Sequence, residues 1–224
     1  MSGDVPDAPP GPELVDPVLV DPVLVDLAAQ LVAGGRRALL GLAGPPGAGK
    51  STLARGLVDA LTARGVTAVL LPMDGFHLAQ AELERLGRAG RKGAPDTFDA
   101  AGFVALLGRV RAGVEIVYAP VFDRGIEEPI AGAIAVDHAT SLVVVEGNYL
   151  LHDDGAWARV APLLDACWYL DLPDDVRVAR LVARHVAHGR SPRAAREWVL
   201  RSDEANARLV ARGRGRADLL VPVT

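Results

Sequence analysis

The chain contains Gly44-Pro45-Pro46-Gly47-Ala48-Gly49-Lys50-Ser51, which fits G-x-x-x-x-G-K-[ST], a pattern typical of loops that bind nucleotide phosphates. Its glycines let backbone N–H groups turn inward toward phosphate oxygens without a side-chain clash. Lys50 would supply a cation to the β- and γ-phosphates, and the Ser51 hydroxyl would serve Mg²⁺. ATP and Mg²⁺ are the expected cofactors, and the predicted cofactor-binding residues are Gly44, Gly47, Ala48, Gly49, Lys50, Ser51 and Thr52.

The residues on either side of this loop support the prediction. The apolar run 38–43 indicates a buried strand, and residues 52–61 place apolar side chains at helical spacing. A helix that begins directly after the loop favours an anion at its N-terminus. The alternative is a Gly/Pro turn with an accidental Lys-Ser pair. Only two of the 24 Lys and Arg residues are lysines, Lys50 and Lys92, so a lysine at this position favours the phosphate-binding interpretation.

The composition limits the classes of protein that need to be considered. A length of 224 residues, half of them hydrophobic, predicts one α/β domain with a lid or small insertion. The net charge of -4 argues against a general binder of nucleic acid or of anionic membranes. The single cysteine, Cys167, is expected to be buried and reduced. With neither a signal-peptide pattern nor an apolar run of membrane-spanning length, the expected location is cytoplasmic.

Two regions are expected along the chain. Residues 1–22 are Pro-rich and predict a disordered arm, in which Asp-Pro-Val-Leu-Val occurs twice, from Asp16 and from Asp21. Two copies are too few for a solenoid, and a docking role for their Val/Leu pairs is the alternative interpretation. Residues 23–224 form the predicted globular domain, beginning with a helix over 24–32.

Strands and helices are expected to alternate through this domain. We expect strands over 38–43, 67–71, 115–118, 142–146, 167–170 and 219–223, and helices over 52–61, 78–86, 100–111, 157–164, 174–186 and 192–212. Apolar strands that alternate with helices indicate a mostly parallel sheet covered on both faces. The predicted fold class is α/β, a three-layer α/β/α P-loop architecture with a helical lid. Ligands bind such sheets at the carboxyl ends of the strands.

Two carboxylates follow predicted strands at that edge. The second expected strand runs into Met73-Asp74, where Asp74 could accept the proton of an attacking hydroxyl. His77 is the second candidate for this role, or could orient a substrate. Glu146 ends the run 142–146, an arrangement that suits a residue serving Mg²⁺ together with Ser51. For both acids the alternative is a residue that merely ends a strand before a glycine turn.

Arginines gather in a predicted lid around residues 177–195. Arg177, Arg180 and Arg184 share one helical face, and Arg190 follows after a Gly break. Lid arginines can stabilise negative charge on a transferring phosphoryl group and exclude water. The alternative is a solvated basic face. His185 and His188 are three residues apart, but no third residue with metal spacing accompanies them, so a zinc site is not expected.

The chain resembles a group of P-loop kinases that act on small molecules, namely bacterial pantothenate kinase, uridine kinase and phosphoribulokinase. The resemblance covers residues 36–224 and rests on the phosphate loop and on the segments 73–77, 91–99, 118–124 and 145–151, together with the lid. It implies transfer of the ATP γ-phosphate to a hydroxyl group, with Asp74 as the base, Lys50, Arg180 and Arg184 beside the phosphates, and Glu146 serving Mg²⁺. The implied substrate-binding residues are Asp74, His77, Arg91, Lys92, Phe98, Tyr118 and Arg124.

One segment departs from the pantothenate kinase pattern. Phe122-Asp123-Arg124 stands where those enzymes have a Tyr-Ser-His type sequence, which argues against pantothenate as the acceptor. The pattern is more similar to nucleoside/nucleotide kinase-like and fructose-transport kinase-like proteins. We hypothesise that Arg124 meets an anionic or hydroxyl-rich acceptor, so that Arg124→Ala raises the acceptor KM far more than the ATP KM.

Several readings stay open at this point. A nucleoside kinase shares the expected architecture, whereas a GTPase switch is disfavoured because no Asn-Lys-x-Asp motif is present. A non-catalytic nucleotide-binding protein is the remaining alternative. The small-molecule acceptor is not identified by the sequence, adenine is expected near the turn before Leu219, and a homodimer is a further expectation from the resemblance.

Overall fold

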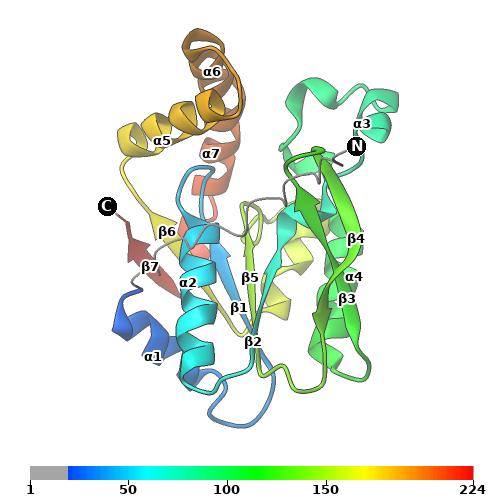
Figure 1. Cartoon of the computed structure of the whole chain (residues 1–224), viewed down its shortest axis with the longest axis vertical. Coiled ribbons are helices and arrows are strands. Elements are labelled where there is room, and N and C mark those ends of the chain that lie inside the picture. The colour runs from blue at the N-terminus through cyan, green and yellow to red at the C-terminus, as the bar shows by residue number, and fades with distance from the viewer. Residues whose placement is uncertain (1–19, 224) are drawn as a thin grey trace, which may run out of the picture.

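The computed structural model describes residues 20–223, which form a central parallel sheet between helical layers (Figure 1). Its five strands lie in the order β2-β5-β1-β6-β7, and each neighbouring pair is parallel. They are β1 (Ala38–Ala43), β2 (Ala68–Pro72), β5 (Leu142–Gly147), β6 (Ala166–Asp171) and β7 (Leu219–Pro222). The predicted three-layer α/β architecture is therefore confirmed.

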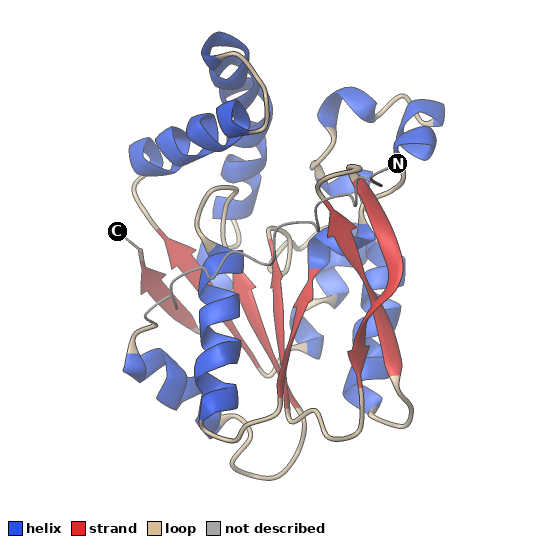
Figure 2. Cartoon of the chain, viewed as in Figure 1, coloured by secondary structure: helices blue, strands red, loops and turns tan. Residues whose placement is uncertain are grey.

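Helices cover both faces of this sheet (Figure 2). The α-helices of residues 20–223 are α1 (Pro22–Gln30), α2 (Lys50–Ala63), α3 (Gln80–Arg85), α4 (Ala100–Ala112), α5 (Asp174–Ala187), α6 (Pro192–Trp198) and α7 (Glu204–Ala211). No helix in residues 20–223 is long and apolar enough to cross a membrane. Alternate residues of β1 point to opposite faces, so Leu40 packs in the core beneath α1 and α2, while Leu39 packs in the core that α4 covers.

A β-hairpin extends beside the sheet and was not expected from the sequence. β3 (Val117–Asp123) pairs antiparallel with β4 (Glu128–Val136), whereas the sequence predicted only a strand over 115–118 followed by a loop. β4 exposes the small residues 131–133 to solvent and so lacks the apolar alternation by which strands are recognised. The register shifts next to Pro120, which has no N–H to donate to the ladder.

The lid consists of helices that project beyond the carboxyl ends of the strands (Figure 1). α5 ends at Ala187, and the chain turns before Ser191, whose side chain accepts a hydrogen bond from the Ala194 amide at the start of α6. A π-helical turn, Val199–Asp203, joins α6 to α7. The expected helices around a break are thus present, and the π turn changes the helical phase of the residues that follow it.

Two boundaries differ from the expectations. The second copy of the repeat is not part of an arm, because Asp21 caps α1 by accepting a hydrogen bond from the Val23 amide at 2.9 Å and Pro22 is its first residue. The rest of the predicted arm, residues 1–19, lies outside the described residues. The helix expected over 157–164 is instead two 3₁₀ turns, Gly155–Arg159 and Ala161–Leu163.

Candidate active site

The phosphate loop connects β1 to α2, and its backbone forms a cradle. Gly49 precedes the first helical residue with φ of +84°, a left-handed conformation that glycine adopts without strain. The Leu53 amide donates to the Gly49 carbonyl at 3.0 Å, so the amides of the first turn precede the hydrogen-bond ladder of α2 and face outward. Gly44 and Ala48 are buried residues of the loop, and a Cβ at Gly44 would lie 3.1 Å from the Leu170 carbonyl oxygen of β6. This arrangement suits phosphate oxygens.

Lys50 is held inside the loop. Its Nζ donates to the Pro45 carbonyl at 3.0 Å and to Asn148 Oδ1 at 2.7 Å. Burial lowers the pKa of Lys50 to about 8, although the nearby Glu146 and Asp74 carboxylates act in the opposite direction. Asn148 lies in the segment 145–151, and no role was predicted for it from the sequence. Its position two residues after Glu146, at the end of an apolar strand, was the available signal.

Ser51 and Glu146 meet at the end of β5. The Ser51 hydroxyl donates to Glu146 Oε1 at 2.9 Å, and the carboxylate is buried. Burial and the negative charge of Asp74 raise the pKa of Glu146, while Lys50 opposes the shift. A hydroxyl and a buried carboxylate at this spacing are oxygen ligands of the kind that Mg²⁺ takes. The residues therefore fit a magnesium ion beside the phosphate loop.

Asp74 and His77 lie in and after the 3₁₀ turn Met73–Phe76, which follows β2. Asp74 Oδ2 is 3.3 Å from Arg124 Nη2. His77 Nδ1 lies 2.8 Å from the Asp74 carbonyl oxygen, a contact in which the ring nitrogen must donate. Burial lowers the pKa of His77, despite the nearby Asp74 carboxylate. A neutral imidazole whose other nitrogen accepts a hydrogen bond suits both roles expected of His77, which are orienting a substrate hydroxyl and removing its proton.

An aromatic wall continues from His77. The His77 ring lies 4.0 Å from the ring of Phe98 and 4.7 Å from that of Phe122, centroid to centroid. Lys92 Nζ lies 5.1 Å above the Phe122 ring and donates to the Glu127 carbonyl at 2.7 Å. Lys92 thereby joins the 91–99 segment to the turn of the β3–β4 hairpin.

The lid completes the site from the opposite side. Arg180 and Arg184 of α5 line the same pocket as the phosphate loop, and both side chains are exposed to solvent there. Desolvation and the neighbouring charge of Arg124 lower the pKa of Arg184. Arg177 does not join them: its side chain is 1% exposed and is paired with Asp174 and Glu204, away from the pocket. The three-arginine face expected from the sequence therefore contributes two residues to the site.

Residues of the phosphate loop, of the turn after β2, of the hairpin and of the lid open into one cavity of about 780 Å³. It is lined by the phosphate loop and by residues from segments 74–80, 89–98, 122–127, 146–148 and 180–206. A volume of this size is in the range of pockets for small molecules. The carboxyl ends of β1, β2 and β5 and the lid thus converge on a site for phosphates at one end and a small molecule at the other.

Sequence and structure comparisons agree with this geometry. The model of the "Phosphoribulokinase / Uridine kinase family" matches residues 39–224. The chain belongs to this family. It is 36% identical over 201 residues to the uncharacterised protein YggC of Escherichia coli K12, a match that covers 88% of this chain and 82% of that protein.

Two further relatives of this phosphoribulokinase/uridine kinase family member carry kinase names. C227.14 of Schizosaccharomyces pombe, provisionally named a uridine kinase, is 36% identical over 169 residues, which is 72% of each chain. The crystal structure of a protein from Silicibacter sp. TM1040, provisionally named a fructose transport system kinase, is 40% identical. It superposes with a TM-score of 0.82 over 89% of this chain and 98% of that one.

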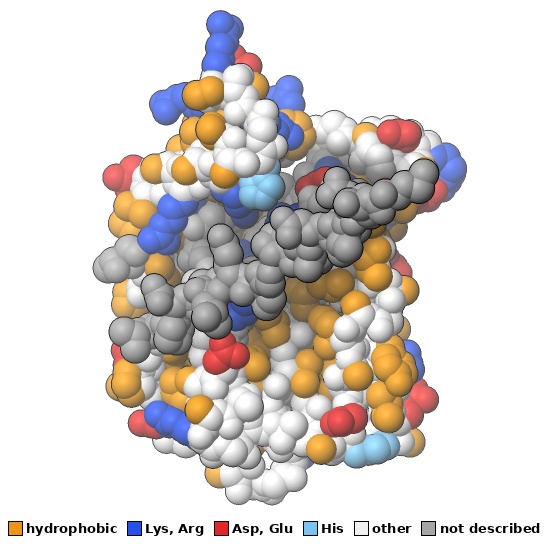
Figure 3. Space-filling model, viewed as in Figure 1, with side chains coloured by type: hydrophobic (Ala, Val, Ile, Leu, Met, Phe, Trp, Pro, Cys, Tyr) orange, Lys and Arg blue, Asp and Glu red, His pale blue; other side chains and the backbone are white. Residues whose placement is uncertain are grey.

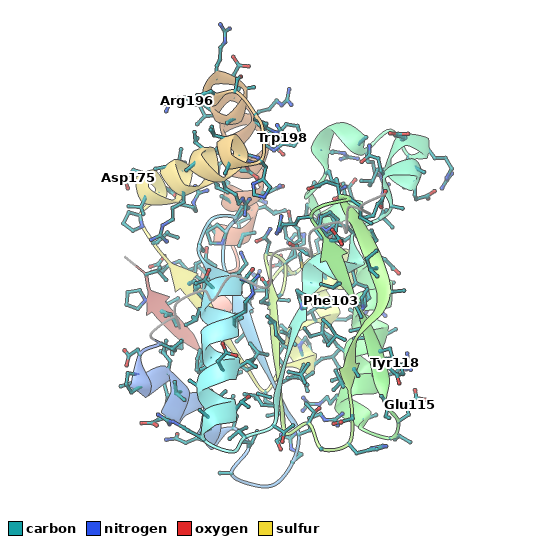
Figure 4. The ribbon with its side chains drawn as sticks, in the orientation of Figure 1. Phe103, Glu115, Tyr118, Asp175, Arg196 and Trp198 are labelled. Carbon is teal, nitrogen blue, oxygen red and sulfur yellow. The ribbon has the colours of Figure 1, made fainter. Side chains whose placement is uncertain are left out.

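Two of the expected substrate residues of this family member lie away from the pocket. Tyr118 is 59% exposed on the outer face of the hairpin, toward the end that carries Glu115 (Figure 4). Its neighbours Val117 and Ala119 are buried, so strand alternation turns Tyr118 outward. Arg91 is paired with Asp96 at 2.7 Å and does not line the cavity. Hydrophobic side chains are visible over this hairpin in Figure 3.

Three lid contacts were missed in the sequence. His185 Nε2 lies 2.9 Å from Asp203 Oδ2, which joins α5 to the π turn at the cavity wall. Asn206 Nδ2 donates to the Gly93 carbonyl at 3.3 Å and connects α7 to the 91–99 segment. Arg190 stacks 4.2 Å from the Trp198 ring, on the side of the lid that faces α3 (Figure 4). Each contact joins two different elements, and the spacing of residues within one helix carries no signal for such contacts.

A second cavity, of about 250 Å³, lies on the other side of the phosphate loop. Pro45, Tyr169 and Arg177 line it, as does Arg214 in the turn before Leu219. This is the turn beside which adenine was expected.

Proposed function

We propose that this chain transfers the γ-phosphate of ATP to a hydroxyl group of a small metabolite. One observation carries the proposal: the Asp74 carboxylate opens into the same cavity as Lys50, Ser51 and Glu146. A phosphate cradle with a carboxylate across from it is the arrangement that phosphoryl transfer to an alcohol requires. The kinase family to which the chain belongs supports the same reaction.

Each residue has a part in the proposed reaction. Asp74 accepts the proton of the acceptor hydroxyl as the new oxygen–phosphorus bond forms and the bond to the β-phosphate breaks. Lys50 and the amides of the loop hold the phosphates, and Arg180 and Arg184 face the charge from the lid. Ser51 and Glu146 would hold Mg²⁺, which would neutralise charge on the β- and γ-phosphates.

In this proposal the acceptor and the adenine of ATP lie in different cavities. The acceptor lies against the aromatic wall of His77, Phe98 and Phe122, below Lys92. The second cavity beside Arg214 supports the placement of adenine near the turn before Leu219. A large apolar body is not expected in the acceptor, because the charged side chains of Asp74, Lys92 and Arg124 line the cavity together with the aromatic rings.

The test is ADP release from MgATP with a panel of acceptors: pantothenate, uridine, cytidine, fructose, ribose and their phosphorylated forms. We expect turnover that depends on one class of acceptor, and we expect Asp74→Asn to lower kcat by about 10³-fold or more, as removal of a catalytic base does. Asp153→Asn is the matched control, because Asp153 is exposed and paired with Arg216 outside the cavity.

A non-catalytic nucleotide-binding protein is the second candidate. It is favoured if ATP binds but Asp74→Asn and the wild-type protein release ADP at the same rate with every acceptor. The position of both Asp74 and Glu146 at the cavity supports the catalytic reading.

A further inference from the structure

The β3–β4 hairpin holds Arg124 next to Asp74, which is the proton acceptor in the proposed reaction. Arg124 Nη2 lies 3.3 Å from Asp74 Oδ2, although the two residues are fifty positions apart. An acceptor hydroxyl that donates its proton to Asp74 must come within about 3 Å of the same carboxylate. The Arg124 guanidinium therefore stands beside the position of the reacting oxygen and of the phosphorus that it attacks.

The turn that carries Arg124 is built to hold this position. Asp123 Oδ1 accepts hydrogen bonds from the Gly125 amide at 2.7 Å and from the Ile126 amide at 3.3 Å. Glu127 has φ of +57°, and it is the one non-glycine residue with positive φ in the described part of the chain. Its carbonyl receives the hydrogen bond of Lys92. Contacts on both sides thus fix the backbone of the turn, while the Arg124 side chain is 54% exposed and is not confined by packing.

The charges around Arg124 point to an anion. Arg124 on the hairpin and Arg184 on the lid line one cavity from opposite sides. Desolvation lowers the pKa of Arg184, and the positive charge of Arg124 is the second cause of this shift. Two guanidinium groups that face each other across a site repel unless an anion lies between them. Asp74 offsets Arg124 in this structure through one contact at Oδ2, and this attraction weakens when Asp74 accepts a proton and loses its charge.

We propose that Arg124 is a catalytic residue, which turns from Asp74 toward the transferred phosphoryl group as Asp74 takes up the proton of the acceptor hydroxyl. This rests on the proposed function. In the step, the acceptor oxygen bonds to the γ-phosphorus, its proton passes to Asp74, and the electron pair of the broken bond stays on the β-phosphate oxygen. Arg124 donates to the phosphoryl oxygens from the hairpin side, opposite the lid arginines. This differs from a residue that only binds the acceptor.

The first experiment measures recognition of a transferring phosphoryl group. Calorimetric titration of the full chain, with saturating acceptor wherever the panel has identified one, compares Mg·ADP with Mg·ADP plus aluminium fluoride, a mimic of that group, in the wild type, Arg124→Ala and Arg109→Ala. Arg109 is a matched control, since it is 52% exposed and pairs with Glu115 at the far end of the hairpin. We expect Arg124→Ala to weaken binding of the mimic by about tenfold or more and to leave Mg·ADP binding unchanged within about twofold.

The second experiment separates catalysis from acceptor binding, with the acceptor that turns over in the panel. We expect Arg124→Ala to lower kcat by about 10²-fold, with an acceptor KM within about threefold of the wild type. Arg124→Lys keeps the charge without the planar fork, so its kcat should lie between the two. A raised acceptor KM with an unchanged kcat overturns the proposal and leaves Arg124 as an acceptor ligand.

The failures of the two proposals are distinguishable. If the wild type binds the mimic more tightly than Mg·ADP and Arg124→Ala does so equally well, the role of Arg124 is overturned while the proposed function stands. If the wild type does not distinguish the mimic from Mg·ADP and releases no ADP with any acceptor, both are overturned. Thermal unfolding checks that Arg124→Ala is folded, and an exposed ion pair predicts little change in its midpoint.

Discussion

The two ends of the active-site cavity are built in different ways. At the phosphate end, nine consecutive residues, 44–52, supply nearly everything, and Lys50 is buried and hydrogen-bonded on two sides. At the acceptor end, the 3₁₀ turn after β2, the 91–99 segment, the hairpin and the lid each contribute a few side chains. Arg124 and Asp74 there remain partly exposed and meet at 3.3 Å.

This difference predicts which substitutions change the acceptor and which ones abolish nucleotide binding. The phosphate end is organised before any ligand arrives, because the short loop, the start of α2 and the end of β5 fix it through backbone geometry. The acceptor end depends on contacts between segments far apart in the chain, such as Lys92 with Glu127 and Asn206 with Gly93. Substitutions there should change the acceptor without removing the nucleotide, as expected of functional loops on a rigid scaffold.

The two lysines of the chain give the largest test of this contrast. Lys50→Met should lower kcat by about 10³-fold with every acceptor and weaken ATP binding, because it removes a buried cation at the phosphates. Lys92→Met, at the acceptor end, should raise the acceptor KM by about tenfold and leave the ATP KM unchanged. Steady-state kinetics with both substrates varied measure the two effects. Equal loss of ATP affinity in both variants would contradict the division.

The pH dependence of kcat/KM for ATP should also depend on residues of the phosphate end. The pKa of Lys50, lowered to about 8, means that the substrate-free protein loses this charge at higher pH, so kcat/KM for ATP should fall about tenfold per pH unit above that value. Bound phosphates favour the charged form, so kcat should persist to higher pH. The raised pKa of Glu146, caused by burial and Asp74, should add a decline on the acid side. A kcat/KM for ATP that stays level up to pH 10 would rule out this role for Lys50.

The same lowered pKa has a consequence for stability. Lys50 binds its proton less tightly when folded than when unfolded, where its pKa is 10.5. The charged form therefore destabilises the fold below about pH 8, and this penalty disappears as the pH rises from there toward 10.5.

Two glycines of the loop test its contact with the lid. Gly47 and Gly49 have φ of +82° and +84°, so alanine strains both backbones similarly, by about 1–2 kcal/mol. A Cβ at Gly47 would also lie 2.8 Å from Leu181 Cγ and 3.1 Å from the Arg177 carbonyl oxygen, whereas one at Gly49 would meet open space. We expect Gly47→Ala to cost about 1–3 kcal/mol more than Gly49→Ala in urea unfolding. Equal costs would mean that the lid moves freely away from the loop.

The same contrast explains what the sequence could predict. The parallel strands and the phosphate loop were recognised because an apolar run and a local motif depend on neighbours in the chain. The π turn, by contrast, shifts the helical phase and brings Asp203 to His185 in a way that a uniform helix over 192–212 does not. Hairpin strand β4 was missed because its exposed small residues show no alternation.

Tyr118 and Phe122 show that the motif alone does not predict which side chains of a strand face the cavity. Both belong to the segment 118–124 that carried the resemblance, and both lie on β3. The motif says that this strand borders the acceptor, but the bulge beside Pro120 and the packing of Val117 and Ala119 decide which side chains turn inward. Phe122 packs against His77, whereas Tyr118 faces solvent.

This pair gives the smallest expected effect and the closest comparison. Tyr118→Ala should change kcat, the acceptor KM and the free energy of unfolding little, within about twofold and about 0.5 kcal/mol, because an exposed side chain is removed. Phe122→Ala removes a ring that contacts His77 and lies beneath Lys92, so the acceptor KM should rise several-fold to about tenfold. The ATP KM serves as the internal control for both. If Tyr118→Ala raised the acceptor KM as much as Phe122→Ala does, the acceptor would have to reach the outer face of the hairpin. The placement of the acceptor on the inner face, against Phe122, would then be wrong.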